Sequence, residues 1–413
     1  MSSTGRGTIA IIGQGYVGLP LAMTAAESGW KVLGIDNSDS KVHQINSGVS
    51  PVEDVSDYQL KSVIENGSYV SSTDFTILSK AQIIIICVPT PLNKEREPDL
   101  SILKSAVRSI APNISDNTLV LSESTSFPGT LRNIIVPIIE SLLPKNSNIV
   151  YYASAPERVN PGDSNWNQRN TPRLVGGISD EAAIKAVSFY ESICNSVIRV
   201  SKPEIAEAAK LLENTFRLVN IALVNEFNQI CSVNELDINE VIKAASSKPY
   251  GFMPFKPGIG VGGHCIPVDP IYLKWWAQQS GVKTALIETA DFVNHAMPRF
   301  VADKILSIVG ESIKNPRILI LGVAYKSGVG DIRETPVKEL YDFLTTKGAK
   351  VSWNDPFVKV WGNSNPVDIN WPCDIAVLTT NQPGMEFGDL ISRGVKLLDC
   401  TGTLHGVKGV ISL

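Results

Sequence analysis

The chain has 413 residues, of which 43% are hydrophobic and 19% are charged. This composition is that of an ordinary globular protein and excludes a disordered or collagen-like chain. At roughly 150 residues per domain, the length predicts two to three domains. A formal net charge of −4 argues against nucleic acid as the main partner. No apolar run reaches the ~20 residues that cross a bilayer, so no membrane partner is expected. The 6 scattered cysteines indicate a reducing compartment, and we therefore expect a cytoplasmic protein.

The first part of the chain alternates short apolar segments with helical ones. Strands are expected over Thr8–Ile12, Lys31–Ile35, Ile83–Val88, Leu119–Leu121 and Ile149–Tyr152, and helices over Tyr16–Glu27, Ile102–Ile110 and Leu131–Leu142. Continuous apolar strands separated by helices predict a buried parallel sheet.

The middle of the chain is helical, and the last part returns to the earlier alternation. No strong breaker interrupts the segment from Pro203 to about Val233, which predicts one helix of roughly 45 Å. A loop rich in Gly and Pro follows at 249–270. Strands are then expected over Arg317–Gly322, Lys350–Trp353, Asp374–Leu378 and Lys396–Leu398, with a helix over Thr335–Lys347. We expect an α/β protein with two α/β domains and a helical middle, divided as 1–200, 201–310 and 311–413.

The first expected strand runs into a GxGxxG pattern, GQGYVG at residues 13–18. Gly13 permits a tight turn, Gly15 lets the backbone approach a pyrophosphate, and Gly18 allows close packing of the helix on the strand. Asp36 follows the second strand, where an acid can bind a ribose 2′-hydroxyl. No Arg comes directly after it, so the pattern favours NAD over NADP. The alternative is a plain glycine turn with a solvated Asp.

Further polar residues follow the other expected strands of the first part. The chain has Pro89–Thr90, Ser124–Thr125 and Glu157 at these positions. Ligands of open α/β sheets lie beyond the carboxyl ends of the strands, so these residues are candidates for the same dinucleotide site. Each one taken alone is more often a plain turn residue.

Cys265 lies in the glycine-rich sequence GGHCIPVD at residues 262–269. A thiolate nucleophile needs a lowered pKa, which nearby cations or backbone amides can supply, and we favour a functional thiol here. The other five cysteines suit packing. His264 either raises the local positive charge or packs in the turn. No CxxC or HxxxH spacing exists, so no metal site is expected.

Two further groups of charged residues lie in the middle and last parts. Lys210, Asn214 and Arg217 share one face of the long helix; they form either a solvated stripe or a site that stabilises an oxyanion. Tyr325–Lys326 and the segment 331–336 follow the strand RILIL. They either present cations to a second phosphate ligand or cap the next helix at Thr335.

Seven motifs in chain order resemble the UDP-glucose/GDP-mannose dehydrogenase family. They are GQGYVG, CVPTPL, SESTSFPGT, APERVNPG, KLLENTFR, GVGGHCIPVDP and GVAYKSGVGDIRETP, which span residues 13–336. The resemblance implies two Rossmann-like doubly wound domains and a long central helix that forms a homodimer. It also implies oxidation of the C6 alcohol of a UDP-sugar to a carboxylate, with two NAD consumed per turnover.

The resemblance assigns catalytic roles residue by residue. Cys265 would capture the C6 aldehyde as a thiohemiacetal, which a second hydride transfer would convert to a thioester. Lys210 and Asn214 would stabilise the oxyanions together with an ordered water, and Thr125 would help to position this water. Asp269 would sit beside Lys210 and the hydrolytic water.

Glu157 would be the acid that assists hydrolysis of the thioester. The expected cofactor site comprises Gly13, Gly15, Tyr16, Val17, Gly18, Asp36, Lys41, Pro89, Thr90, Ser124, Thr125 and Arg333. The expected substrate site comprises Glu157, Arg158, Val159, Asn160, Lys210, Asn214, Arg217, Phe255, Gly258, Gly262 and Lys326.

One motif departs from the pattern of the UDP-glucose enzymes. Where these have PEFLREG, the chain has PERVNPG at residues 156–162, so a second carboxylate is missing. The change is similar to the branch that acts on UDP-N-acetylhexosamines, with Arg158 and Asn160 as candidate partners of the amide. GGHCIPVDPIYL resembles UDP-N-acetylglucosamine 6-dehydrogenases most. The alternatives are UDP-N-acetylmannosamine, UDP-glucose, a two-electron hydroxyacid dehydrogenase that needs no Cys265, and a non-catalytic NAD-binding protein.

Overall fold

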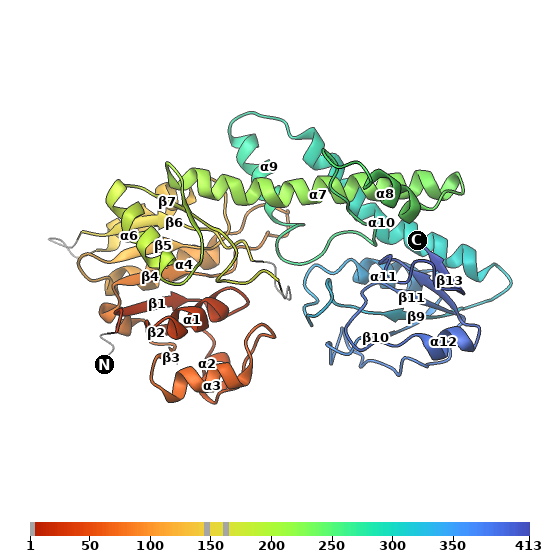
Figure 1. Cartoon of the computed structure of the whole chain (residues 1–413), viewed down its shortest axis with the longest axis horizontal. Coiled ribbons are helices and arrows are strands. Elements are labelled where there is room, and N and C mark those ends of the chain that lie inside the picture. The colour runs from red at the N-terminus through yellow and green to blue at the C-terminus, as the bar shows by residue number, and fades with distance from the viewer. Residues whose placement is uncertain (1–4, 144–148, 160–164) are drawn as a thin grey trace. The chain divides into compact units, whose positions relative to one another are not determined.

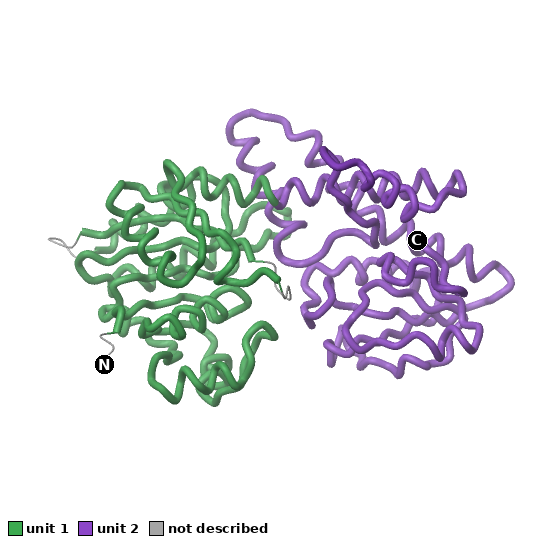
Figure 2. The backbone as a smooth tube through the Cα atoms, in the orientation of Figure 1, with its two compact units in different colours: residues 1–213 green, residues 214–413 purple. Residues whose placement is uncertain are grey.

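The computed structural model describes residues 5–143, 149–159 and 165–413. These residues form two compact units, 1–213 and 214–413, which are described separately (Figure 2). The boundary falls inside one helix, so the predicted division at residues 200 and 310 stays a prediction.

The first unit is built on one sheet, which in the described residues has eight strands in the order β3-β2-β1-β4-β5-β6-β7-β8 (Figure 1). All neighbours pair in parallel except β6 and β7. The strands are β1 Thr8–Ile12, β2 Lys31–Ile35, β3 Tyr69–Ser72, β4 Ile83–Ile86, β5 Leu119–Ser122, β6 Tyr151–Ser154, β7 Arg173–Gly177 and β8 Val197–Arg199. The helices are α1 Gly18–Glu27, α2 Asp39–Asn46, α3 Asp57–Glu65, α4 Ser101–Ile110, α5 Val136–Leu142 and α6 Asp180–Glu191.

Both faces of this sheet are buried, as its continuous apolar strands predict. Ile9 and Ile11 of β1 pack with residues of α1 and α6 such as Leu19 and Phe189. Their neighbour Ala10, which points to the opposite face, is also fully buried. The sheet is therefore enclosed from both sides, and the ends of its strands are left to form a ligand site.

The long helix α7 runs from Pro203 to Val233, the range expected from the sequence. It begins in the first unit and ends in the second, and Figure 1 draws it as one unbroken helix. Three helices follow it: α8 Ile238–Ala245, α9 Asp269–Gln279 and α10 Ala285–Val309.

The second unit contains a parallel sheet with the strand order β10-β9-β11-β12-β13. Its strands are β9 Arg317–Leu321, β10 Lys350–Asn354, β11 Ile375–Leu378, β12 Lys396–Asp399 and β13 Val410–Ser412, and its further helices are α11 Val337–Thr346 and α12 Gly388–Ser392. One face packs on α10 and α11, and the other face packs on α12. Two doubly wound α/β domains and a long helix were expected, and this prediction is confirmed.

The two sheets begin in the same way. β1 pairs with β2 in parallel, and the next amide, Gly13 N–H, donates to the Ile35 carbonyl at 2.7 Å. β9 pairs with β10 in parallel, and Gly322 N–H donates to the Asn354 carbonyl at 2.8 Å. Each second strand is followed by an aspartate, Asp36 or Asp355. The two units therefore repeat one strand–turn–strand arrangement with different loops.

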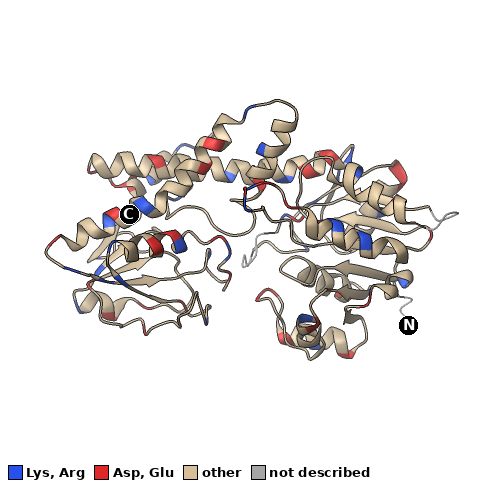
Figure 3. Cartoon of the chain, turned by 180° about the vertical axis from the view of Figure 1, so that it is seen from behind, with Lys and Arg blue, Asp and Glu red and all other residues tan. Residues whose placement is uncertain are grey.

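Charge and hydropathy add little to this picture. Acidic and basic residues are interspersed in each unit (Figure 3). Among the described residues, no helix is both long and apolar enough to cross a membrane.

Candidate active site

The glycine turn after β1 has the geometry of a phosphate-binding loop. Gly13 has φ +95°, and a side chain there would lie 2.6 Å from the Cys87 carbonyl oxygen. A side chain at Gly18 would lie 1.8 Å from the Gly13 carbonyl oxygen, whereas one at Gly15 would meet nothing within 4 Å. Two glycines thus close the turn, and the third leaves open space before the N-terminus of α1, as a pyrophosphate requires.

Asp36 lies at the end of β2 and is directed back to this turn. Its Oδ2 accepts the Gln14 N–H at 2.9 Å and pairs with the Lys41 ammonium at 2.8 Å, and its Oδ1 accepts the Ser38 N–H at 3.1 Å. Three donors leave capacity for a further hydroxyl group, because a carboxylate has about four acceptor positions. These residues fit a dinucleotide with a free ribose 2′-hydroxyl.

The predicted hydroxyl groups do lie at the carboxyl edge of this sheet, but they bond to the backbone. Thr90 Oγ1 donates to the Thr125 carbonyl at 2.6 Å, and Ser124 Oγ donates to the Val88 carbonyl at 2.8 Å. These bonds join the loops after β4 and β5. Of the other predicted cofactor residues, Pro89 is exposed in the same loop, and Tyr16 and Val17 pack half-buried against the core.

Glu157, after β6, is held by four donors. Its Oε1 accepts the N–H groups of Arg158 and Val159, both at 2.6 Å. Its Oε2 accepts Gln168 Nε2 at 2.9 Å and pairs with the Arg173 guanidinium at 2.9 Å. Burial raises the pKa of Glu157, but Arg173, the Val159 N–H, Gln168 and Lys210 outweigh it and the pKa is lowered. The group is ionised at neutral pH.

Arg173 belongs to a buried cluster that the motifs did not reveal. Its Nη1 lies 3.3 Å from Glu123, and its guanidinium stacks 5.1 Å from the centre of the Tyr190 ring. The Tyr190 hydroxyl donates to Glu123. Burial, the largest cause, raises the pKa of Glu123 to about 7. In the sequence, Arg173 is marked only as a charged residue at the start of the otherwise apolar segment RLVGG.

Arg158, a candidate partner for the substrate amide, is engaged within the first unit. Its Nη2 lies 2.7 Å from Glu213 on α7, and its Nη1 donates to the Pro172 carbonyl at 2.7 Å. Asn160, the second candidate, lies outside the described residues. The predicted role of Arg158 stays a prediction.

The predicted polar face of α7 is partly buried. Lys210 and Asn214 are each only 7% exposed, which excludes a solvated stripe for this pair, whereas Arg217 is exposed. Within the second unit, Asn214 Nδ2 donates to the buried Asp269 carboxylate at 2.5 Å. An amide and a carboxylate are thus fixed to each other beside the loop that carries Cys265.

Cys265 is exposed and lies just before α9, four residues from Asp269. Its carbonyl oxygen accepts the N–H groups of Val268 at 3.2 Å and Asp269 at 2.8 Å. The positive end of a helix stabilises a nearby thiolate. None of the six cysteines is in a disulfide, and the other five are buried or half-buried. The pKa of His264 is lowered, chiefly by burial and secondly by the charge of Arg333. The neutral imidazole is therefore favoured.

The loop before Cys265 packs closely on the segment after β9. A side chain at Gly263, which has φ +84°, would lie 2.5 Å from the Tyr325 ring, and one at Gly262 would lie 2.8 Å from Tyr325 Cβ. Gly263 N–H also donates to the Arg333 carbonyl at 3.2 Å. The structure therefore brings together two motifs that are about 60 residues apart.

The side chains of that segment are placed differently from one another. Lys326 is half-buried, whereas the Arg333 guanidinium is exposed and pairs with Asp331 at 2.6 Å. The Thr335 hydroxyl donates to the Val323 carbonyl at 2.9 Å and accepts the Val337 N–H at the start of α11. Thr335 thus serves the helix start, while the phosphate role of Lys326 stays a prediction.

Two buried asparagines hold the earlier part of the glycine-rich loop. Asn225 of α7 accepts the Gly258 N–H at 2.9 Å and donates to Asn294 of α10 at 3.0 Å. Phe255 meets Phe216 edge to face, with ring centres 5.9 Å apart. Sequence analysis missed both asparagines, although Asn225 follows Asn214 by three helical turns on the same face.

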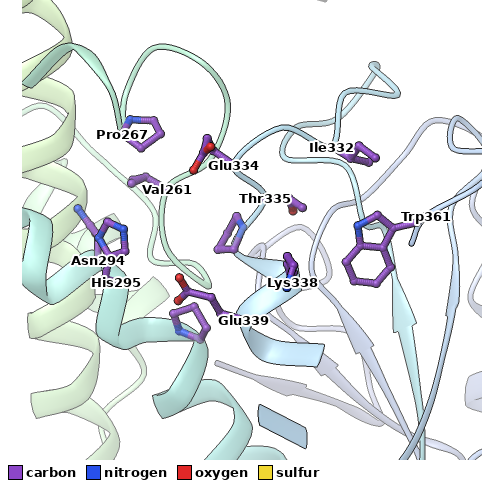
Figure 4. A pocket seen from close by; sticks show the side chains of 12 residues that line it. Val261, Pro267, Asn294, His295, Ile332, Glu334, Thr335, Lys338, Glu339 and Trp361 are labelled. Carbon is purple, nitrogen blue, oxygen red and sulfur yellow. The ribbon is translucent and has the colours of Figure 1, made fainter. Parts of the chain in front are cut away.

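A cavity of about 220 Å³ borders this loop in the second unit (Figure 4). It is lined by side chains from the loop at Val261 and Pro267, from α10, and from the start of α11. It contains none of the predicted substrate residues. In the described part of the chain, no group of three or more His, Cys, Asp or Glu side chains is placed to hold a metal ion.

Three family models match the chain. They describe the NAD binding domain, the central domain and the UDP binding domain of the UDP-glucose/GDP-mannose dehydrogenase family, at residues 7–194, 204–296 and 319–387. The chain belongs to this family, and the resemblance of its motifs is confirmed. It is an NAD-dependent nucleotide-sugar dehydrogenase, with the glycine turn in its NAD binding domain.

Individual relatives match most of the chain. A UDP-N-acetyl-D-mannosamine dehydrogenase from Pyrococcus horikoshii is 35% identical over 91% of this chain and 89% of that protein. A UDP-N-acetyl-D-glucosamine 6-dehydrogenase from Pseudomonas aeruginosa is 34% identical over 85% of this chain and 83% of that protein. A solved UDP-D-ManNAc dehydrogenase structure from P. horikoshii has a TM-score of 0.87 and 33% identity, and covers 98% of both chains.

Proposed function

We propose that the chain oxidises the C6 alcohol of a UDP-N-acetylhexosamine to a carboxylate in two successive NAD-dependent steps, with Cys265 as the nucleophile. The observation that carries this proposal is the exposed Cys265 thiol in a glycine-rich loop at the N-terminus of α9. A two-electron hydroxyacid dehydrogenase has no use for a thiol at this place.

The glycine turn and Asp36 are the residues that would hold the cofactor. When bound, NAD accepts the hydride that leaves C6. Gly15 lets the backbone approach the pyrophosphate, and Asp36 has capacity for the ribose hydroxyl. The predicted contacts of Tyr16, Val17 and Arg333 complete the proposed site.

The proposed reaction consumes one water and releases three protons. Loss of a hydride from C6 and a proton from its hydroxyl gives the aldehyde. The Cys265 thiolate adds to this carbon, and the new oxyanion takes up a proton to give a thiohemiacetal. Loss of a second hydride and a proton gives a thioester. Water then attacks the thioester, the carbon–sulfur bond breaks, and the products are the carboxylate, the regenerated thiolate and two protons.

Lys210 and Asn214 are proposed to stabilise the oxyanions of these steps. Both are buried, so a negative oxygen beside them interacts more strongly than it would in water. The hydrogen bond from Asn214 to Asp269 fixes the amide before substrate arrives, so its dipole needs no reorganisation during the reaction.

The second unit is proposed to bind the UDP moiety. Phe255, Gly258, Gly262 and Lys326 lie in the two loops that pack together there. In this proposal, residues 1–200 bind NAD, 201–310 form the catalytic and dimer region, and 311–413 bind the nucleotide. The reaction needs Cys265 as a free thiol, which a reducing cytoplasm provides.

UDP-N-acetylglucosamine is the sugar that the motif GGHCIPVDPIYL favours. Relatives named for N-acetylmannosamine and N-acetylglucosamine are 35% and 34% identical to the chain, so identity does not separate the two. Release of NADH is to be measured with both sugars, with UDP-N-acetylgalactosamine and with UDP-glucose. If UDP-glucose is oxidised fastest, the assignment to N-acetylated sugars is wrong.

The first prediction concerns the nucleophile. Cys265→Ser is expected to lower the turnover number at least about a thousandfold, because a Ser hydroxyl ionises far less readily than a Cys thiol. The wild-type enzyme should release two NADH per sugar consumed, measured by absorbance at 340 nm against product by mass spectrometry. Cys373→Ser, at a half-buried thiol of the same unit, is the matched control and should retain wild-type turnover. One NADH per sugar with an aldehyde as the final product would reject the four-electron reaction.

A further inference from the structure

We propose that Asn225 is a positioning residue for the substrate. Together with Asn294, it fixes the backbone of the glycine-rich loop at Gly258 in the conformation that receives the nucleotide. The inference rests on the proposed function, because it takes this loop to be part of the UDP-sugar site. Neither asparagine belongs to the expected substrate site, and neither needs to touch the substrate in order to act in this way.

The first observation is a relay of hydrogen bonds that links α7 and α10 to the loop. Asn294 Nδ2 donates to the Leu218 carbonyl at 3.1 Å. Asn294 Oδ1 accepts Asn225 Nδ2 at 3.0 Å, and Asn225 Oδ1 accepts the Gly258 N–H at 2.9 Å. All four residues belong to the second unit. The relay thus runs from one backbone group to another through two side-chain amides.

The relay fixes the orientation of both amides. A backbone carbonyl can only accept, so Leu218 requires the NH₂ group of Asn294, and the Asn294 oxygen is left for Asn225. Asn225 must then present its own NH₂ group to Asn294 and its oxygen to the loop. The Gly258 N–H therefore meets an acceptor that is in place before a ligand binds, and a loop that is ordered in advance costs less to order on binding.

The second observation is that the relay is buried. Asn225 and Asn294 are 0% and 1% exposed, and Gly258 is half-buried. A buried polar group that loses its partner costs more free energy than an ordinary hydrogen bond contributes. Without the Asn225 oxygen, the Gly258 N–H would have to find another acceptor, and the loop would have to move.

The third observation is that the two residues after Gly258 also lie on α10. Ile259 is 6% exposed and belongs to the core that includes Val301 of this helix. Gly260 has φ +122°, and a side chain there would lie 2.8 Å from the Asn294 carbonyl oxygen. Pro298 lies four residues after Asn294 and has no N–H, so it cannot donate to this carbonyl as another helical residue would. Asn294 therefore meets the loop with its backbone as well as through Asn225.

The Cys265 end of the loop is held by different contacts. Gly263 N–H donates to the Arg333 carbonyl, and a side chain at Gly263 would overlap the Tyr325 ring. Neither contact involves the two asparagines. Loss of the relay should therefore weaken substrate binding more than it slows the reaction at the thiol. This difference is measured as a rise in KM with little change in kcat.

The decisive variant is Asn225→Leu, which keeps an uncharged side chain of similar size and removes both hydrogen bonds of Asn225. Its matched control is Asn228→Leu, at another asparagine of α7 that is 1% exposed. The Asn228 Nδ2 atom has no hydrogen-bond partner among the residues that the structure describes. Both variants bury the same apolar side chain in the same helix, and only Asn225→Leu removes a bond to the loop. The probe is UDP, titrated by calorimetry, with NAD titrated in parallel.

A positioning role predicts a selective loss of UDP binding. Asn225→Leu should bind UDP at least about tenfold more weakly than wild type. Its affinity for NAD should not change, because the proposed NAD site lies in the first unit. KM for the sugar that the wild type oxidises should rise by a similar factor, and kcat should stay within about threefold of wild type. Asn228→Leu should change none of these quantities.

Asn294→Ala provides a second test, and it also serves if Asn225→Leu does not fold. It leaves the Asn225 oxygen present but no longer fixed, so UDP should bind about threefold more weakly. Equal losses of UDP affinity in Asn225→Leu and Asn228→Leu would overturn the inference, because helix packing would then explain both. A lower kcat at unchanged KM would overturn it too. A wild-type protein that binds no UDP would instead refute the proposed function of the second unit.

Discussion

Three glycines within one turn have three different surroundings. A side chain at Gly13 or Gly18 would overlap a carbonyl oxygen, at 2.6 Å and 1.8 Å. A side chain at Gly15 would project into open space. The first two glycines are therefore required by the fold, and we expect Gly15 to be required by the pyrophosphate that would approach the turn.

We expect Gly15→Ala to separate binding from stability. Its free energy of unfolding should stay within about 0.5 kcal/mol of wild type, and its affinity for NAD, measured by calorimetry, should fall at least about tenfold. Gly18→Ala should instead destabilise the protein by about 1–3 kcal/mol, since the helix must move away from the strand. Gly388→Ala, at another position without neighbours within 4 Å, should change neither quantity. Unchanged affinity in Gly15→Ala would refute the placement of the pyrophosphate.

The sequence predicts single residues well where one short segment contains all the information. Gly13, Gly18 and Asp36 lie where the spacing of the motif requires. The partners of Glu157 could not be predicted, because Arg173 and Glu123 meet it only through strand order and the reversed direction of β7.

At the scale of elements, uninterrupted segments were predicted best. The range of α7 agrees with the expected helix from Pro203 to about Val233, because Pro203 starts it and no breaker occurs before its end. The strand predicted over Leu119–Leu121 is one residue longer in the structure, as β5. The strands β3, β7, β8 and β13, which are only three to five residues long, were not predicted. Several helices were also missed; one of them, α10, contains Pro298, which is typical of a helix break.

The start of α7 also holds the loop that carries Ser124 and Thr125. Glu207 accepts the Gly129 N–H at 2.7 Å and the Leu131 N–H at 3.1 Å, where a π-helical turn, Leu131–Ile135, begins. A carboxylate at a helix N-terminus satisfies amides that have no partner within the helix. One buried side chain thus joins α7 to the cofactor edge of the sheet.

Glu207→Ala is expected to lower the free energy of unfolding by about 2–4 kcal/mol, because two buried N–H groups lose their acceptor. Urea unfolding followed by circular dichroism measures the change. Glu204→Ala is the control from the same turn of α7; its more exposed ion pair with Arg132 should be worth no more than about 1 kcal/mol. Equal losses in the two variants would contradict the capping role.

At the scale of the whole molecule, α7 leaves an apolar surface exposed. Phe216, Leu223, Phe227 and Ile230 are between 41% and 62% exposed and follow one another by seven, four and three residues, which places them on one helix face. A continuous exposed apolar stripe on a helix marks an interaction surface. We expect a second copy of the chain to cover it.

Light scattering tests this expectation. The wild-type protein should have twice the mass of a 44.7 kDa chain, and Leu223→Asp should shift it toward the single-chain mass, because a charge would be buried in the interface. Tyr58→Asp, at a side chain that is 85% exposed on α3, should leave the mass of the assembly unchanged. A wild-type protein with the mass of one chain would refute the dimer.

Asp36 and Asp355 occupy equivalent places in the two sheets, but their surroundings differ. Asp355 is saturated by Val323 N–H, Ala324 N–H, Phe357 N–H and the Gln382 amide, at 2.8 to 3.3 Å. A side chain at Gly322, the counterpart of Gly13, would lie 2.1 Å from the Thr380 carbonyl oxygen. Both turns are closed at the glycine, but Asp36 keeps acceptor capacity for a further hydroxyl group and Asp355 does not.

This difference has a kinetic consequence. In the proposed four-electron oxidation, both hydrides are transferred to NAD bound at the turn after β1, so reduced cofactor has to depart and a fresh molecule has to enter between the two steps. A sugar bound covalently to Cys265 during that interval cannot escape as a reactive aldehyde. The thiol would then act as a tether that spans the exchange of cofactor, and the sugar would be retained even when the second cofactor arrives slowly.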